Sequence, residues 1–124
     1  MATPEYEGTA PLISDRYIIT MTAGEALSIG DIVEITADYT VKKPTGKNSL
    51  KVVGICLTNA ANGARVTIVN RGLCRIKTMG TVVAGDQLAA SGGTAFADNT
   101  SKNTSIIAMA IKASVNNVCD GIVW

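Results

Sequence analysis

The chain has 124 residues, of which 47% are apolar, 17% charged and 4% aromatic. This balance indicates one globular domain with an aliphatic core and excludes an intrinsically disordered chain. The formal net charge is only +1, which argues against binding along a nucleic-acid backbone, and the lack of histidine removes the commonest general acid or base of enzymes.

Residues 1–12 are predicted to form an extended arm, because prolines and a glycine interrupt regular structure there. Tyr6 and Leu12 are the large apolar side chains of the arm, and we expect them to anchor it on a neighbouring subunit. The alternative is a terminus without a function. Residues 13–124 are expected to form a single β domain. The sequence predicts no secretion signal and no run near the roughly 18 apolar residues that span a bilayer.

From residue 14 onwards, short β-branched runs alternate with turns at spacings of roughly 8–12 residues. Strands are predicted within residues 16–22, 31–36, 39–41, 50–57, 64–70, 72–78, 81–91, 106–114 and 121–124. Residues 91–105 are expected to form a loop with a hairpin around residues 94–97. The pattern predicts an all-β fold, either a small β-barrel or a β-tulip-like sandwich.

Three turn signals set the expected connections between these strands. Asn62-Gly63 is the strongest hairpin signal in the sequence. Asn70-Arg71-Gly72 predicts a tight turn, so that the runs before and after it would form a β-meander. ALSIGDIVEIT and TVVAGDQLAAS share a Gly-Asp turn, which indicates reuse of one turn and is too short to indicate a repeat.

The charges are unevenly distributed along the chain. Residues 42–77 contain eight cations and no acid, whereas residues 1–41 contain seven acids and one cation. Strand alternation places the cations of the basic segment on the solvent-facing side. They are either solvated and neutralised within the fold, or they contact a partner. In the second case the expected contact residues are Arg65, Arg71, Arg75 and Lys77.

Three classes of partner are open to this basic segment. Nucleic acid is disfavoured because no aromatic residue lies between residues 40 and 95 to stack on bases. A membrane surface is disfavoured because no basic amphipathic helix is predicted. A protein remains, and copies of the chain could meet with opposite charges facing and close into a ring such as a homotrimer. Trp124 is either a contact residue or, as we expect, a barrel-closing core residue.

The residues that carry most enzyme chemistry are missing or scattered. Cys56, Cys74 and Cys119 are odd in number and widely spaced, and without histidine or a CxxC they form neither a disulfide framework nor a zinc site. Cys56 and Cys74 are predicted to be buried free thiols, which fits a reducing compartment. No activated nucleophile, carboxylate couple or phosphate loop is visible, so we expect no enzyme, no cofactor and no metal.

The chain contains, in this order, GEALSIGDIVEI, VVGICL, NGARVTIVNRGLCRI, VVAGDQLAAS, IIAMAIKAS and GIVW. Over about residues 10–124 this order resembles the capsid cement, or head decoration, proteins of tailed bacteriophages of the lambda decoration-protein type. The resemblance implies a β-tulip or small-barrel fold and assembly, often as trimers, on the outside of the expanded capsid. It also implies the major capsid protein as partner, synthesis in the host cytoplasm and a final location on the virion. The chain departs from the family in its few aromatic residues.

Two other functions stay open from the residues alone. One is a small β-barrel module that binds a carbohydrate or a peptide on a virion or cell surface. The other is a binder of single-stranded nucleic acid.

Overall fold

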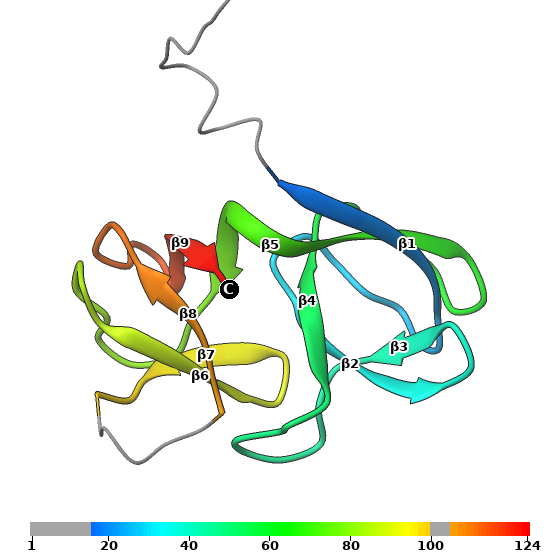
Figure 1. The fold of residues 1–124 in the computed structure, drawn as a ribbon, viewed down its shortest axis with the longest axis horizontal. Coiled ribbons are helices and arrows are strands. Elements are labelled where there is room, and N and C mark those ends of the chain that lie inside the picture. Colours follow the sequence, from blue (N-terminus) through cyan, green and yellow to red (C-terminus); the bar gives the residue numbers. More distant parts are fainter. Residues whose placement is uncertain (1–15, 100–104) are drawn as a thin grey trace, which may run out of the picture.

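The computed structural model describes residues 16–99 and 105–124, and these residues form strands and no helix (Figure 1). The strands are β1 (Tyr17–Ala23), β2 (Ile32–Ala37), β3 (Thr40–Lys42), β4 (Val52–Cys56), β5 (Arg65–Lys77), β6 (Gln87–Ser91), β7 (Thr94–Ala97), β8 (Ile106–Ala110) and β9 (Val118–Val123). The predicted all-β fold is confirmed. The arm predicted at residues 1–12 lies outside the described residues.

Five strands close into a barrel on the right of Figure 1. Their order is β1–β3–β2–β4–β5, and the ring closes because β5 also pairs with β1. The pairing of β1 with β3 is parallel, whereas the other pairings in the ring are antiparallel. The predicted small β-barrel is therefore present, and we call it the first barrel.

Strand β5 continues from the first barrel into a second layer. Its first half pairs with β1 and β4, and its second half, from Gly72 onwards, pairs with β9. The tight turn predicted at residues 70–72 is therefore wrong. The strand instead carries a bulge at Asn70, where the register with β1 shifts, and Gly72 takes a φ of 117°. A bulge followed by a glycine bend uses the same residue types as a turn, so the local sequence does not separate the two.

The later strands form the second layer in the order β5–β9–β8–β6–β7. A parallel bridge between Thr78 and Ala95 brings the chain just after β5 beside β7, and the N–H of Met79 donates to the Ala95 oxygen at 2.8 Å. In the first barrel the end of β1 likewise runs parallel to β3. A single parallel bridge thus closes the second layer at the place where the first barrel has the short β1–β3 ladder, and we call this layer the second barrel.

The two barrels repeat one plan. Strands β2, β3, β4 and the first half of β5 correspond to β6, β7, β8 and β9, while β1 corresponds to the second half of β5. Both repeats open with the Gly-Asp turn, in which Gly30 and Gly85 each have a φ of 92°. The first strand of each repeat, β2 or β6, also has a register shift after its second residue, in its pairing with β4 or β8.

The hydrogen bonds of the two turns match as well. The Asp31 carboxylate accepts from the N–H of Ser28 at 2.8 Å, and the Asp86 carboxylate accepts from the N–H of Val83 at 2.9 Å. The expectation that this shared piece is only a reused turn is therefore wrong, because it opens a whole repeat. The repeat is visible in the strand pairing and register. The two halves of the sequence share few identical residues.

Neighbouring residues on the strands of the first barrel point into two different cores. One core fills the barrel and contains Val33, Cys56 and Ile68. The other core lies between the barrels and continues into the second, and it contains Ile32, Ile55 and Val69. All six are at most 2% exposed. Burying such an aliphatic side chain contributes roughly 1.5–3 kcal/mol, so the joint between the barrels is held by the same force as each interior.

Several connections differ from those expected. Residues 94–97 form strand β7, the hairpin partner of β6, and are not part of a loop. Strands β4 and β5 are antiparallel neighbours as predicted. Asn62-Gly63 forms the centre of a turn, in which the N–H of Ala64 donates to the Ala61 oxygen at 3.0 Å, but this turn lies within the longer connection 57–64 and is not a two-residue hairpin loop. There the N–H of Gly63 donates to the Ala23 oxygen at 2.7 Å, so this connection also binds the end of β1.

Candidate interaction surfaces

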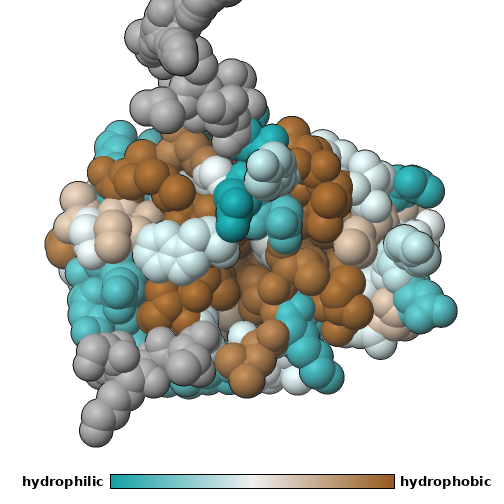
Figure 2. All heavy atoms as spheres, in the orientation of Figure 1, coloured by the Kyte–Doolittle hydropathy of each residue, from teal (hydrophilic) through white to brown (hydrophobic). Residues whose placement is uncertain are grey.

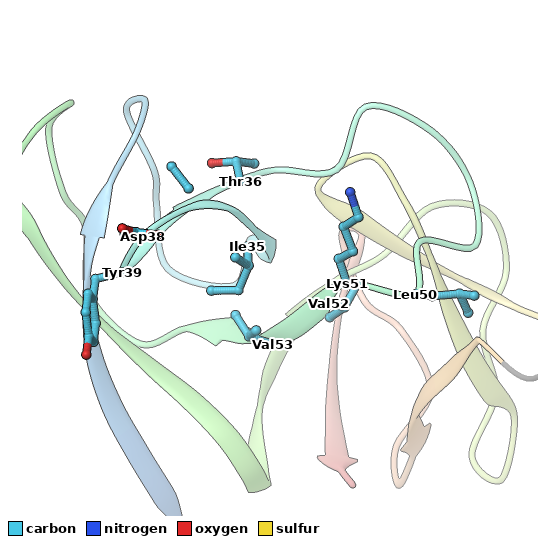
Figure 3. Close-up of a pocket in the computed structure, with 9 residues that line it drawn as sticks. Ile35, Thr36, Asp38, Tyr39, Leu50, Lys51, Val52 and Val53 are labelled. Carbon is cyan, nitrogen blue, oxygen red and sulfur yellow. The ribbon is translucent and has the colours of Figure 1, made fainter.

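The end of the first barrel that carries the β2–β3 turn is hollow, and both apolar and polar side chains line it (Figure 3). Residues 35–39 and 50–53 line a hollow of about 760 Å³ there. Ile35 and Val53 are partly buried and pack on the core of the first barrel. Tyr39 and Leu50 lie on its two sides, 79% and 77% exposed. We call this region the barrel mouth, and its large exposed apolar side chains make it a candidate contact surface.

Tyr39 is held in a backbone conformation that tyrosine rarely adopts. Its φ is 52°, and its carbonyl oxygen accepts from the N–H of Thr22 at 2.7 Å. The left-handed region costs a residue with a side chain roughly 1–2 kcal/mol, and the exposed ring gains no burial in return. The matching turn of the second barrel consists of Gly92 and Gly93. A strained residue with an exposed aromatic ring is a candidate for binding.

Trp124 extends the apolar surface beyond the barrel mouth. Together with Leu50 and Val52 it lines a second hollow of about 190 Å³, and it is 52% exposed. The barrel-closing core position expected for Trp124 is therefore wrong. Val123 fills the core instead, and successive strand residues face opposite sides, so Trp124 faces solvent. Figure 2 shows apolar side chains gathered on this side of the molecule.

The repeat reveals a further apolar surface on the second barrel. In the first barrel a row of paired residues crosses β2, β4 and β5, and it consists of Ile32, Ile55 and Val69. The corresponding row crosses β6, β8 and β9, and it consists of Gln87, Met109 and Ile122. The first row is fully buried, whereas Ile122 is 43% exposed and its two neighbours are half-buried. We call the second row the outer row.

Of the predicted contact cations, Arg65, Arg71 and Arg75 are exposed on β5. The Arg71 guanidinium carbon lies 5.7 Å from the centre of the Tyr17 ring. Arg75 is 3.6 Å from the Asp120 carboxylate, a pair too exposed to contribute much to stability. Their role as contacts stays a prediction.

The fourth predicted contact cation, Lys77, lies in different surroundings. Its Nζ is 2.8 Å from the Asp31 carboxylate, which is 5% exposed, and 3.1 Å from the Ser28 hydroxyl. Lys77 therefore supports the fold. The two other predicted contact residues, Tyr6 and Leu12, lie outside the described residues.

The separation of cations from aromatic rings, expected from the sequence, does not hold in three dimensions. Tyr17 lies beside Arg71 because β1 pairs with β5. The Lys47 ammonium lies 5.1 Å from the centre of the Phe96 ring, because a bridge from Lys47 to Ser91 ties the loop after β3 to the second barrel. The argument against nucleic acid thus loses its aromatic part and keeps the part based on the near-neutral net charge.

The three cysteines are buried free thiols, as predicted for Cys56 and Cys74. Burial, followed by the nearby Asp31 carboxylate, raises the pKa of Cys56 to about 12. Burial likewise raises the pKa of Cys74 to about 12 and also raises that of Cys119. Thiols that stay protonated at neutral pH are poor nucleophiles and poor metal ligands.

Asp86, like Asp31, closes a Gly-Asp turn. The pKa of Asp86 is lowered by the hydrogen bond from the Val83 N–H and then by that from Asn99. Within residues 16–99 and 105–124, no three His, Cys, Asp or Glu side chains are grouped to hold a metal ion. Over the same residues there is no helix with the length and apolarity required to cross a bilayer.

No family model matches the sequence, and no curated protein matches it. Among solved structures, the chain is similar to the N base of the head fiber protein gp8.5 of bacteriophage phi29. The TM-score is 0.68, the similarity covers 88% of this chain and 94% of that chain, and 11% of the residues are identical. At this low identity the similarity shows a shared fold.

Proposed function

We propose that this protein is a structural component of a tailed-phage virion that binds the outer surface of the capsid and stabilises the head, as a decoration or cement protein. The observation that carries the proposal is the fold shared with the base of a phage head fiber over 88% of the chain. The order of motifs along the sequence, which resembles head decoration proteins, supports the same assignment.

The exposed side chains suit a protein that acts by adhesion. Tyr39, Leu50 and Trp124 are each more than half exposed and lie along one apolar surface. Interface energy concentrates in a few aromatic and large apolar anchors of this kind. The partners in this proposal are the major capsid protein and further copies of the chain, with a homotrimer as the assembled form. Three copies held together make each weak contact with the shell nearly intramolecular, which raises the overall affinity.

The test is cosedimentation of the purified protein with heads assembled from the capsid protein of the same phage. We expect saturable binding to expanded heads, weaker binding to unexpanded heads, and a higher disruption temperature for decorated heads. Equal binding to heads of an unrelated phage, or none to its own, would contradict the proposal.

The choice of binding surface can be tested in the same assay. Leu50→Ala and Trp124→Ala should each weaken binding at least about fivefold, since an anchor contributes more than roughly 1 kcal/mol. Met79→Ala is the matched control, because Met79 is 45% exposed and does not line either hollow. Equal losses in all three variants would place the binding surface elsewhere.

A second candidate function is a module that binds a carbohydrate or a peptide, and the barrel mouth favours it. Tyr39 offers an aromatic face, and Asp38 and Lys51 offer charged groups at the same hollow. A glycan array and a peptide library test this directly. Saturable binding of a ligand that is lost in the Tyr39→Ala variant, together with no binding to heads, would favour this function over capsid binding.

A further inference from the structure

The joint between the two barrels serves as a template for a contact between copies. On one side lies the buried row of the first barrel, Ile32, Ile55 and Val69. On the other side lie the buried interior of the second barrel and, at its edge, the β6–β7 turn. The N–H of Ile32 donates to the Gly93 oxygen at 3.0 Å, and the N–H of Gly92 donates to the Gly46 oxygen at 3.0 Å. A row on one barrel therefore packs against the open end of the next barrel, and a hairpin turn borders this joint.

Each half of the joint has an exposed counterpart elsewhere in the molecule. The counterpart of the buried row is the outer row on the second barrel, where Ile122 is 43% exposed. The counterpart of the β6–β7 turn is the β2–β3 turn on the first barrel, where Tyr39 is 79% exposed. The molecule thus has two exposed surfaces, the outer row and the β2–β3 turn, and they correspond to the two sides of the joint between its barrels.

We propose that copies of this chain bind one another head to tail, with the outer row of one copy receiving the β2–β3 turn of the next. The occupant of the outer row is a second copy of this chain. In the molecule itself, the buried row of the first barrel is covered by the second barrel, and the first barrel of another copy has the same plan as that second barrel. The proposal deepens the function proposed above, and it rests on that function for its purpose.

The chemistry of the outer row fits a reversible contact. Met109 and Ile122 supply apolar surface, whereas Gln87 stands where the buried row has Ile32. One polar residue in the row makes this contact weaker than the internal joint, as suits subunits that must also exist apart. Tyr39 adds an aromatic ring at the position where the internal joint has a glycine turn, and aromatic rings dominate interfaces of modest size.

The two surfaces differ, so the contact is heterologous. Such contacts either propagate as a filament or close into a ring, depending on the rotation between successive copies. Closure after three copies would give the trimer proposed for capsid attachment. The unpaired outer row and β2–β3 turn of an open chain would both be covered in the closed ring.

The experiment measures the mass of the native oligomer in the absence of capsids. Ile122→Lys places a charge in the outer row, and Tyr39→Lys replaces the aromatic ring of the β2–β3 turn by a charge. Each variant alone should be monomeric, with its self-dissociation constant raised at least about tenfold. Mixed together, the two variants should form a one-to-one complex, because each retains the surface that the other lacks, and this complex cannot extend.

Val115→Lys is the matched control, since Val115 is 61% exposed and lies outside both surfaces. It should assemble as the unaltered chain does, and thermal melting should show all three variants folded. An unaltered chain that is monomeric overturns the inference, as does a mixture that fails to form the complex. Capsid cosedimentation is read separately: a monomer that binds heads refutes only the head-to-tail contact, whereas a head-to-tail oligomer that ignores heads refutes only the capsid function.

Discussion

Lys77 and Asp31 form an ion pair of 2.8 Å that joins the basic segment of the chain to its acidic first third. The Asp31 side chain is 5% exposed, and it also accepts the N–H of Ser28, so the carboxylate closes the turn that opens the first repeat. Part of the charge division seen in the sequence is thus neutralised inside the fold. The exposed arginines of β5 and the exposed Lys42, Lys47 and Lys51 remain available to a partner.

Replacing Lys77 by methionine should destabilise the protein by about 1–3 kcal/mol. The variant keeps the aliphatic stem but leaves a buried carboxylate with fewer hydrogen-bond donors. Urea denaturation gives the free energy of unfolding. Arg65→Met is the control, and it should change that free energy by less than about 0.5 kcal/mol because Arg65 is exposed. Similar losses for both variants would contradict a structural role for Lys77.

Gly54→Ala should also destabilise the protein, by roughly 1–3 kcal/mol or more. A Cβ at this position would lie 2.2 Å from the Val69 oxygen and 2.6 Å from Cγ2 of Ile68, so β4 and β5 would have to separate. Gly46→Ala is the matched control, because no atom lies within 4 Å of the Cβ it would add. A tolerated Gly54→Ala would mean that the two strands lie further apart than described.

Tyr39→Asn should raise the stability of the free protein by about 0.5–1 kcal/mol. Asparagine tolerates the left-handed conformation better than tyrosine, and the exposed ring contributes no packing that would be lost. The melting temperature should therefore rise, while binding to heads should weaken. Tyr39→Phe keeps the ring and should change neither measurement much. A lower melting temperature for Tyr39→Asn would show that the ring packs against the barrel.

The buried thiols predict a loss of stability at high pH. In the unfolded chain, Cys56 and Cys74 ionise near pH 9.0, whereas burial holds the pKa of each at about 12 in the folded protein. The unfolded state therefore binds fewer protons between pH 9 and 12, and stability is retained below this window and falls within it. The expected slope is about 1.4 kcal/mol for each thiol per pH unit.

Urea denaturation at several pH values measures this slope. The double variant Cys56→Ala and Cys74→Ala should be less stable at neutral pH, because it contains cavities, but it should lose less stability as the pH rises. The comparison also removes every pH-dependent contribution that the two proteins share. Parallel curves for the two proteins would contradict the assigned pKa values.

Reversing Arg65 and Arg75 to glutamate should impair assembly with the capsid or between copies, with little change in the melting temperature. Both side chains are exposed, and the contact of Arg75 with Asp120 is long and solvated. Lys112→Glu is the control, since Lys112 is an exposed cation outside the basic segment. Unaltered assembly would mean that the two arginines are only solvated surface.

The strands and their inward faces could be predicted from alternation, because the period of two is a local property of each strand. Val66, Ile68, Cys74 and Ile76 are buried as expected. Longer-range features could not be predicted. The bulge at Asn70 and the bend at Gly72 have the composition of a turn, and only the pairing of β5 with strands from two barrels distinguishes the alternatives.

The candidate surfaces were largely hidden in the sequence. The sequence predicts Tyr39 in a strand, Leu50 in a buried run and Trp124 in the core, because large apolar residues are usually buried. The repeat supplies the missing signal, since it aligns Tyr39 with a glycine turn and Ile122 with the buried Val69. Comparison of corresponding positions in the two barrels therefore indicates which apolar side chains are exposed in one barrel and buried in the other.

Strand β5 has a mechanical consequence. Tension applied between the two barrels runs along one continuous backbone and not through side-chain contacts alone, and it loads the ladders on either side of Gly72 in shear. Pulled apart, the halves should yield in a single step, because neither can lose this strand and keep its own ring. In the capsid role proposed above, the two barrels would therefore bear load as one elastic body.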